Sequence, residues 1–264
     1  MERCVYCAAM TISIADICRY PVKGLAADHP SSVTVAAGAV IPFDRRFALV
    51  HASSRVDKAQ PDWAQKNEFL MLARDEKLAQ LGIEFDADTA DLTITRKGKS
   101  VSRGVLTDQT GRTVLQTFLA AFMPDGPRGK PVIVEAPEEK SFSDVPANLI
   151  SIINLATVKD IERVVREPVD PLRFRGNLYL EGLPAWQESS WVGKDINIGN
   201  GVVLHVQEPI GRCAATNVDP ATGQRDLNIP LTLRKGFGHT NCGVYAKVKA
   251  GGTISIGDTV SEPG

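Results

Sequence analysis

The residues best suited to chemistry stand in one stretch, residues 208–223, which reads EPIGRCAATNVDPATG. Cys213 directly follows Arg212 in this stretch. An adjacent guanidinium group favours the thiolate, which is the nucleophilic and metal-binding form of cysteine. A lone cysteine is more commonly a small, buried core residue. The residues by themselves therefore leave a reactive Cys213 and a structural Cys213 both open.

A second stretch, Arg173-Phe174-Arg175-Gly176-Asn177, carries two arginines at positions i and i+2. In a strand these two side chains would share one face. Like charges side by side are unfavourable unless an anion neutralises them, and planar guanidinium groups suit bidentate contacts to phosphate. The pattern predicts an anion site. Because the formal net charge is only -1, such a site must be a local cluster of basic side chains.

The remaining cysteines give weaker signals. Five cysteines, an odd number, argue against a disulfide framework and favour a reducing compartment, so we expect a cytoplasmic protein. Cys4 and Cys7 have C-x-x-C spacing but lack a second pair to complete a zinc site. We interpret residues 1–9 as a disordered leader without function. We expect Cys18 in the core, and Cys242 is a candidate second thiol near the site.

Composition excludes several functional classes. The chain of 264 residues has 43% hydrophobic and 23% charged residues, which is ordinary for a globular protein with a sizeable core. There is no apolar run long enough to span a membrane and no signal-peptide layout. The near-neutral charge gives no attraction to nucleic acid or to an anionic membrane, so we expect neither as a partner. The four histidines have no metal-ligand spacing, and only His239 is a candidate to line a pocket.

Hydrophobic periodicity places these residues on a scaffold of short strands. Residues 113–123 and 158–165 instead have helical periodicity, and Thr157 is the expected capping residue of the second helix. Pro209 has no N–H to donate, so it should end the strand that leads to Cys213. Many short strands and few helices predict a mainly β fold, a barrel with a few peripheral α-helices. The expected strands are 11–20, 33–35, 46–50, 132–134 and 202–206, with shorter β segments at 63–69, 71–73, 83–85 and 92–95.

The stretch around Cys213 resembles the signature of MOSC domains, the C-terminal module of molybdenum cofactor sulfurases. In that family an arginine-cysteine pair ends a strand and is followed by Thr-x-Val-Asp-Pro-x-Thr-Gly, which residues 216–223 match. The resemblance implies a β-barrel MOSC domain at residues 131–264. It also implies an N-terminal MOSC-associated β-rich region at residues 10–130, packed beside the barrel so that the two complete a cofactor cleft. Further similar segments, in the family's order, are residues 173–180, 186–191, 195–199, 243–246 and 252–260.

The same resemblance implies roles for individual residues. Cys213 would be both the catalytic residue and the molybdenum ligand. Lys23 of a Tyr-Pro-x-Lys motif, Arg46 at the start of a strand, and Arg175 would contact the phosphate of the cofactor. Gly176 departs from the proline that is usual at its position, which loosens the turn without removing a donor. The other expected cofactor-binding residues are Asn154, Thr157, Asn177, Arg212 and Tyr245.

The function implied by the resemblance is that of a molybdenum cofactor enzyme. The chain is similar to the MOSC reductases of N-hydroxylated compounds, a group that includes the amidoxime-reducing component of mitochondria. Electrons would come from a separate donor protein, a ferredoxin-type or flavin-type reductase, since the chain ends at Gly264 without a plant-type ferredoxin motif. An alternative is a carrier of sulfur or of the molybdenum cofactor that uses a Cys213 persulfide. Pyridoxal phosphate is not expected, and a non-catalytic module is a third interpretation.

Overall fold

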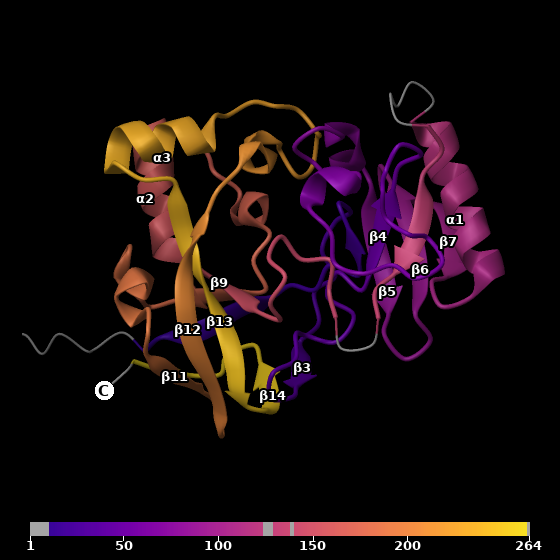
Figure 1. Ribbon diagram of the computed structural model, residues 1–264. Coiled ribbons are helices and arrows are strands. Elements are labelled where there is room, and N and C mark those ends of the chain that lie inside the picture. Colours follow the sequence, from indigo (N-terminus) through magenta and orange to yellow (C-terminus); the bar gives the residue numbers. More distant parts are fainter. Residues whose placement is uncertain (1–10, 124–128, 138–139, 263–264) are drawn as a thin grey trace, which may run out of the picture.

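The main feature of the computed structural model, which describes residues 11–123, 129–137 and 140–262, is a seven-stranded sheet. The two end strands of this sheet meet, because the Ile14 N–H donates to the Asp258 carbonyl at 2.9 Å and the Val260 N–H donates to the Ile12 carbonyl at 2.8 Å. The sheet therefore curls into a barrel (Figure 1). In sheet order the strands are β1 (Ser13–Ile17), β10 (Leu178–Glu181), β9 (Ile150–Asn154), β13 (Asn241–Ala250), β12 (Val202–Gly211), β11 (Asp195–Ile198) and β15 (Val260–Ser261).

Side-chain alternation fills the interior of the barrel. Along β12 the residues Val202, Leu204 and Val206 are fully buried, whereas the residues between them are partly exposed. This is the period-two pattern of a strand with one face against a core. Each of the remaining strands of the barrel also contributes apolar residues to this core. The predicted fold class, a mainly β barrel with a few peripheral helices, is confirmed.

Beside the barrel lies a region with its own core and two small sheets (Figure 1). One contains β2 (Val22–Lys23), β4 (Phe47–Val50) and β8 (Val132–Glu135), and the other contains β5 (Gly82–Asp86), β6 (Asp91–Arg96) and β7 (Lys99–Val105). Helix α1 (Gln109–Phe122) packs on β7. A further sheet pairs β3 (Ser32–Val35) with β14 (Gly252–Ser255), and its buried residues belong to the barrel core.

Strands cross the predicted division at residue 130 in both directions. β1 precedes this division yet lies in the barrel, and β8 follows it yet pairs with β4. The division into residues 10–130 and 131–264 stays a prediction. The expected leader, residues 1–9, lies outside the described residues.

Two helices, α2 (Leu155–Val165) and α3 (Ile229–Phe237), pack against each other at one end of the barrel (Figure 1). The predicted helix at 158–165 is confirmed but begins earlier. Thr157 does not cap it. The cap is Asn154, whose side chain accepts a hydrogen bond from the Ala156 N–H at 3.0 Å. None of the helices in the described part of the chain has the length and apolar character needed to span a bilayer.

Two local predictions around the site are wrong. Pro209 does not end its strand: β12 continues to Gly211, with Pro209 opposite Val244, because bulges on either side absorb the missing N–H. Residues 173–177 are not a strand. Pro171–Phe174 form a short 3-10 helix, η3, and Arg175 follows it in the left-handed conformation, with φ of 50°. The predicted β segments at 63–69 and 71–73 are also wrong: this part of the chain contains turns and the 3-10 helix η1 (Lys66–Glu68), with one isolated bridge between Phe69 and Val50.

Candidate functional site

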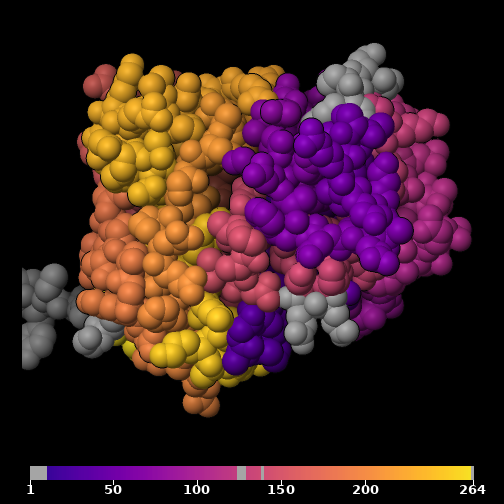
Figure 2. Space-filling view, in the orientation of Figure 1, coloured from indigo at the N-terminus to yellow at the C-terminus, as the bar shows by residue number. Residues whose placement is uncertain are grey.

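A cavity of about 370 Å³ lies where the barrel meets the N-terminal region. Figure 2 shows the seam between these two parts, the violet N-terminal residues on one side and the orange and yellow C-terminal residues on the other. Basic side chains outnumber acidic ones around the cavity, so an anionic ligand is favoured there. The basic lining residues are Lys23, Arg45, Lys66, Arg173, Arg175 and Arg212, and the acidic ones are Asp44, Asp144 and Glu208.

Cys213 stands at the wall of this cavity, two residues beyond the end of β12. It is a free cysteine with a partly exposed side chain. Its backbone is fixed, because its carbonyl accepts hydrogen bonds from the Thr216 N–H at 3.1 Å and the Thr216 hydroxyl at 2.9 Å. Its Sγ makes no hydrogen bond to any residue that the structure describes. A thiol in this position is available to an incoming electrophile or metal.

Arg175 reaches the cavity because its left-handed backbone turns the chain at the end of η3. Its Nη1 donates to the Leu25 carbonyl at 2.8 Å, and its guanidinium lies 4.2 Å from the centre of the Tyr20 ring. The other guanidinium donors have no hydrogen-bond partner among the described residues. Burial and the nearby Arg45 lower the pKa of Arg175. A bound anion would relieve both effects.

Arg45, and not Arg46, joins Arg175 in the cavity. Arg45 Nη1 binds Asp44 Oδ2 at 2.5 Å and its Nη2 donates to the Arg175 carbonyl at 2.7 Å. Arg46 turns the other way and binds Glu135 through Nη2 at 3.1 Å. The reason is the backbone of Arg45, which is left-handed with φ of 50° just before β4 and so changes which of the two side chains faces inward. The adjacent Arg45 and Arg46 in the sequence indicated an arginine at this site, but the sequence did not show which of the two side chains faces the cavity.

Lys23 is buried at the cavity wall and already paired. Its Nζ donates to the Phe142 carbonyl at 2.8 Å and to Asp144 Oδ1 at 2.6 Å. Burial lowers the pKa of Lys23, which Asp144 partly offsets. Burial raises the pKa of Asp144, but Lys23 outweighs this and brings it to about 2. Asp144 belongs to a polar loop in which the sequence identified no partner for the lysine.

Arg212, Asn177 and Tyr245 also line the cavity. The Arg212 guanidinium donates to the backbone carbonyls of Phe174, at 2.8 Å, and Cys242, at 2.8 Å from Nε, and so ties three chain segments together. Asn177 Oδ1 accepts from the Ser151 N–H and hydroxyl, and its Nδ2 donates to the Cys18 carbonyl at 3.1 Å. Burial raises the pKa of Tyr245. The side chains of Arg212 and Asn177 thus donate hydrogen bonds to the backbone around the cavity.

Other candidate residues lie away from the cavity. Asn154 and Thr157 are fully buried and bind the carboxylate of Glu188, at 2.9 Å and 2.8 Å, whose pKa burial raises. Cys242 is buried, and burial raises its pKa to about 12. His239 packs near Trp186, with ring centres 5.3 Å apart, and does not line the cavity.

The buried side chain of Arg173 lines the cavity, but its guanidinium group is paired with acidic residues that do not line it. Its guanidinium is paired with Asp226 at 2.6 Å and with Asp219 at 3.2 Å. The expected pair of adjacent arginines on one strand face is therefore wrong, because the 3-10 helix separates the directions of Arg173 and Arg175.

The long barrel strand β12 leads to a free thiol, Cys213, at a basic cavity. This arrangement defines a class of proteins that can hold an anionic group beside a cysteine. Over the same region, residues 139–261 of this chain match the MOSC domain family.

Individual relatives are more distant. The chain is 28% identical to mitochondrial amidoxime reducing component 2 of Bos taurus over 123 residues, which cover 42% of this chain and 36% of that protein, and the Rattus norvegicus protein gives the same figures. The chain therefore spans little more than a third of the length of these curated relatives. Among solved structures, YuaD of Bacillus subtilis has a TM-score of 0.45 at 13% identity, covering 95% of this chain and 94% of that one. YiiM of Geobacillus stearothermophilus has a TM-score of 0.35 at 19% identity, covering 44% and 54%.

Proposed function

We propose that this protein is a molybdenum cofactor enzyme that reduces N-hydroxylated or N-oxide compounds. The observation that carries the proposal is the meeting of one free thiol, Cys213, with a cluster of basic side chains, most of them buried or half-buried, in a single cavity. The MOSC family is associated with molybdenum cofactor binding, and the curated relatives are named for amidoxime reduction. A sulfur carrier would need the thiol but not the basic cluster, so the cluster favours the enzyme.

The residues around the cavity fit a phosphate-bearing group. Arg175 has guanidinium donors without partners among the described residues. Burial lowers its pKa, so its charged form is less favourable until an anion is present. Arg45 would take the role expected for Arg46, because it lies beside Arg175 in the cavity. Lys23 has one ammonium donor left after its bonds to Phe142 and Asp144. Charge-assisted contacts of this kind are the strong ones for phosphate.

Cys213 would hold the metal of the cofactor. A soft thiolate suits a metal that is otherwise bound by sulfur, and the fixed backbone of Cys213 sets the direction of its side chain. When bound, the cofactor supplies the redox chemistry that cleaves the N–O bond, with electrons from outside and protons, and water leaves. Arg212 would keep the strand end in place, since it joins the segments that carry Phe174 and Cys242. The electrons would come from a separate ferredoxin-type or flavin-type donor.

The test uses Cys213→Ser in protein produced with molybdenum cofactor. We expect this variant to keep much of its pterin, because the basic side chains remain, and to lose reduction of an amidoxime by an artificial one-electron reductant. Cys242→Ala is the matched control, because it removes a buried thiol that does not line the cavity, and it should stay active. Undiminished reduction in Cys213→Ser would refute the ligand role.

The second candidate is a sulfur or cofactor carrier, favoured by the absence of any hydrogen bond from Cys213 Sγ to the described residues. In that case wild-type protein loaded with cofactor would reduce no N-hydroxylated compound with any donor. A sulfur donor would instead convert Cys213 to a persulfide, which mass spectrometry detects. Persulfide on wild type but not on Cys213→Ser, without reductase activity, would replace the enzyme proposal by the carrier.

A further inference from the structure

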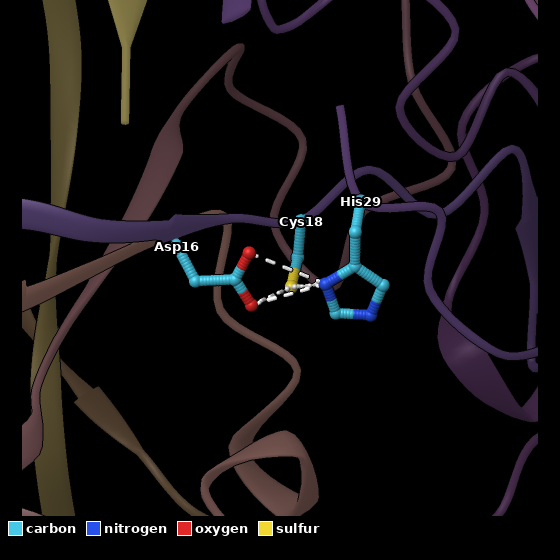
Figure 3. A group of neighbouring side chains, drawn as sticks. All are labelled: Asp16, Cys18 and His29. Carbon is cyan, nitrogen blue, oxygen red and sulfur yellow. Dashed lines mark hydrogen bonds and ion pairs between the residues drawn. The ribbon is translucent and has the colours of Figure 1, made fainter. Parts of the chain in front are cut away.

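Outside the cavity, three metal-ligand side chains converge on one point: Asp16, Cys18 and His29 (Figure 3). Their ligand atoms all lie within 4.8 Å of one another. Cys18 Sγ is 3.6 Å from His29 Nδ1 and 3.4 Å from Asp16 Oδ2, and His29 Nδ1 is 3.2 Å from Asp16 Oδ1 and 3.0 Å from Oδ2. This group is separate from Cys213 and from the residues that line the cavity.

The backbone explains why residues distant in sequence meet here. Asp16 lies in β1 and Cys18 directly follows the end of that strand, at i and i+2, so both side chains leave on the same side. Arg19 and Asp28 then form an antiparallel bridge, with hydrogen bonds of 2.9 Å and 2.7 Å in the two directions. Because the bridge pairs 19 with 28, it sets 18 opposite 29. The ion pair between the Arg19 and Asp28 side chains, at 2.5 Å, holds the same turn closed.

The distances match the edges of a tetrahedral zinc site. With Zn–S of about 2.3 Å, Zn–N of about 2.0 Å, Zn–O of about 2.0 Å and angles of about 109°, the ligand atoms are separated by roughly 3.5 Å for both S···N and S···O and by roughly 3.3 Å for N···O. With Asp16 Oδ2 as the carboxylate ligand, the observed separations are 3.6 Å for S···N, 3.4 Å for S···O and 3.0 Å for N···O. A metal would need little movement of these side chains.

The same contacts also exist as hydrogen bonds when no metal is bound, with the Cys18 thiol donating to the Asp16 carboxylate. A divalent metal would displace the thiol proton of Cys18, so its binding would release a proton. The group is accessible, because the side chains of His29 and Asp16 are 45% and 33% exposed whereas Cys18 is buried beneath them. A metal held here would have an open side for water.

We propose that Asp16, Cys18 and His29 form a binding site for a divalent transition metal, zinc above others, with water as the fourth ligand. One thiolate, one imidazole and one carboxylate are a donor set that suits zinc. The site would also stabilise the segment that leads from Cys18 to Tyr20, whose ring packs against Arg45 and Arg175 of the cavity.

Cobalt(II) is the probe, because thiolate ligation gives a charge-transfer band in the near ultraviolet and tetrahedral geometry gives strong visible bands. The full chain should bind one cobalt per molecule with both signals, and zinc should abolish them by displacement. Cys4→Ser/Cys7→Ser and Cys213→Ser are the control variants, and both should keep the bands. Cys18→Ser should lose the charge-transfer band.

Because Cys18 is buried, a second variant separates ligation from folding. His29→Gln changes an exposed side chain, so it should keep the wild-type melting curve and still weaken cobalt binding by at least about tenfold. Asp28→Asn weakens the ion pair with Arg19 but removes no ligand, so its cobalt affinity should lie between those of wild type and His29→Gln. Absence of cobalt binding to wild type, or a thiolate band that persists in Cys18→Ser or disappears in Cys4→Ser/Cys7→Ser, would overturn the proposal and leave the group as a hydrogen-bonded triad.

Discussion

Replacing Arg175 by alanine removes a cation of the cavity whose guanidinium makes one hydrogen bond to the described residues. The variant loses one hydrogen bond to the Leu25 carbonyl and the contact with the Tyr20 ring. It also removes the repulsion between Arg175 and Arg45, which contributes to the lowered pKa of Arg175. These changes act in opposite directions on the free energy of unfolding. We therefore expect the apo protein to change in stability by only about 1 kcal/mol.

The effect on the cofactor should be larger. A hydrogen bond between charged groups contributes roughly 1.5–3 kcal/mol, and nothing replaces the guanidinium in the alanine variant. Cofactor affinity should fall by about tenfold to a hundredfold. Pterin and molybdenum content per protein, measured after equal dialysis of the variant and wild type, gives this ratio directly. The melting temperature of the apo protein, measured on the same preparations, separates loss of binding from loss of fold.

Arg46→Ala is the matched control for this experiment. Arg46 binds Glu135 outside the cavity, and Glu135 keeps a second partner, Arg112, at 3.2 Å. Removal of such a partly exposed ion pair costs about 0–1 kcal/mol, so this variant should keep its cofactor. Wild-type retention in Arg175→Ala would refute the phosphate role of Arg175. Loss of cofactor in Arg46→Ala at unchanged melting temperature would return that role from Arg45 to Arg46.

Three further predictions concern the scaffold. The pKa of Asp144 is about 2, because its lysine partner outweighs burial, whereas the ordinary value is 3.8. The ion pair with Lys23 therefore adds stability above about pH 4 that is lost as pH falls toward about 2. The difference in melting temperature between wild type and Asp144→Asn should shrink over that range. A difference that stays constant would contradict this prediction. Gly176→Ala places a Cβ 2.3 Å from Ile153 Cγ1 and should cost about 1–3 kcal/mol in urea unfolding, whereas Gly211→Ala, whose Cβ meets nothing nearer than 3.8 Å, is the control. A chain that starts at Met10 should keep its melting temperature and cofactor metal content, and loss of either would give the removed cysteines a role.

Local pattern in the sequence was sufficient for the fold class and for several individual elements. Period-two alternation identified β1 and the first part of β12, and helical periodicity identified α1 and α2, because each pattern depends only on which side chains share a face. The role of Cys213, by contrast, was predicted from the resemblance of residues 208–223 to a family motif and not from periodicity. Its surroundings in the sequence, a strand followed by a polar turn, correspond to β12 and the short 3-10 helix η5 (Ala214–Asn217).

Only the tertiary structure decided which side chains meet. The left-handed backbone of Arg45 before β4 turned Arg45 inward and Arg46 outward, and a 3-10 helix directed Arg173 to Asp219 and Asp226. Alternation cannot anticipate either, because each interrupts the period on which it depends. Asp16, Cys18 and His29 likewise seemed unrelated in sequence, where the histidines showed no metal-ligand spacing. The bridge between Arg19 and Asp28 brings them together, since a pairing of two chain segments determines neighbours that no spacing along one segment contains.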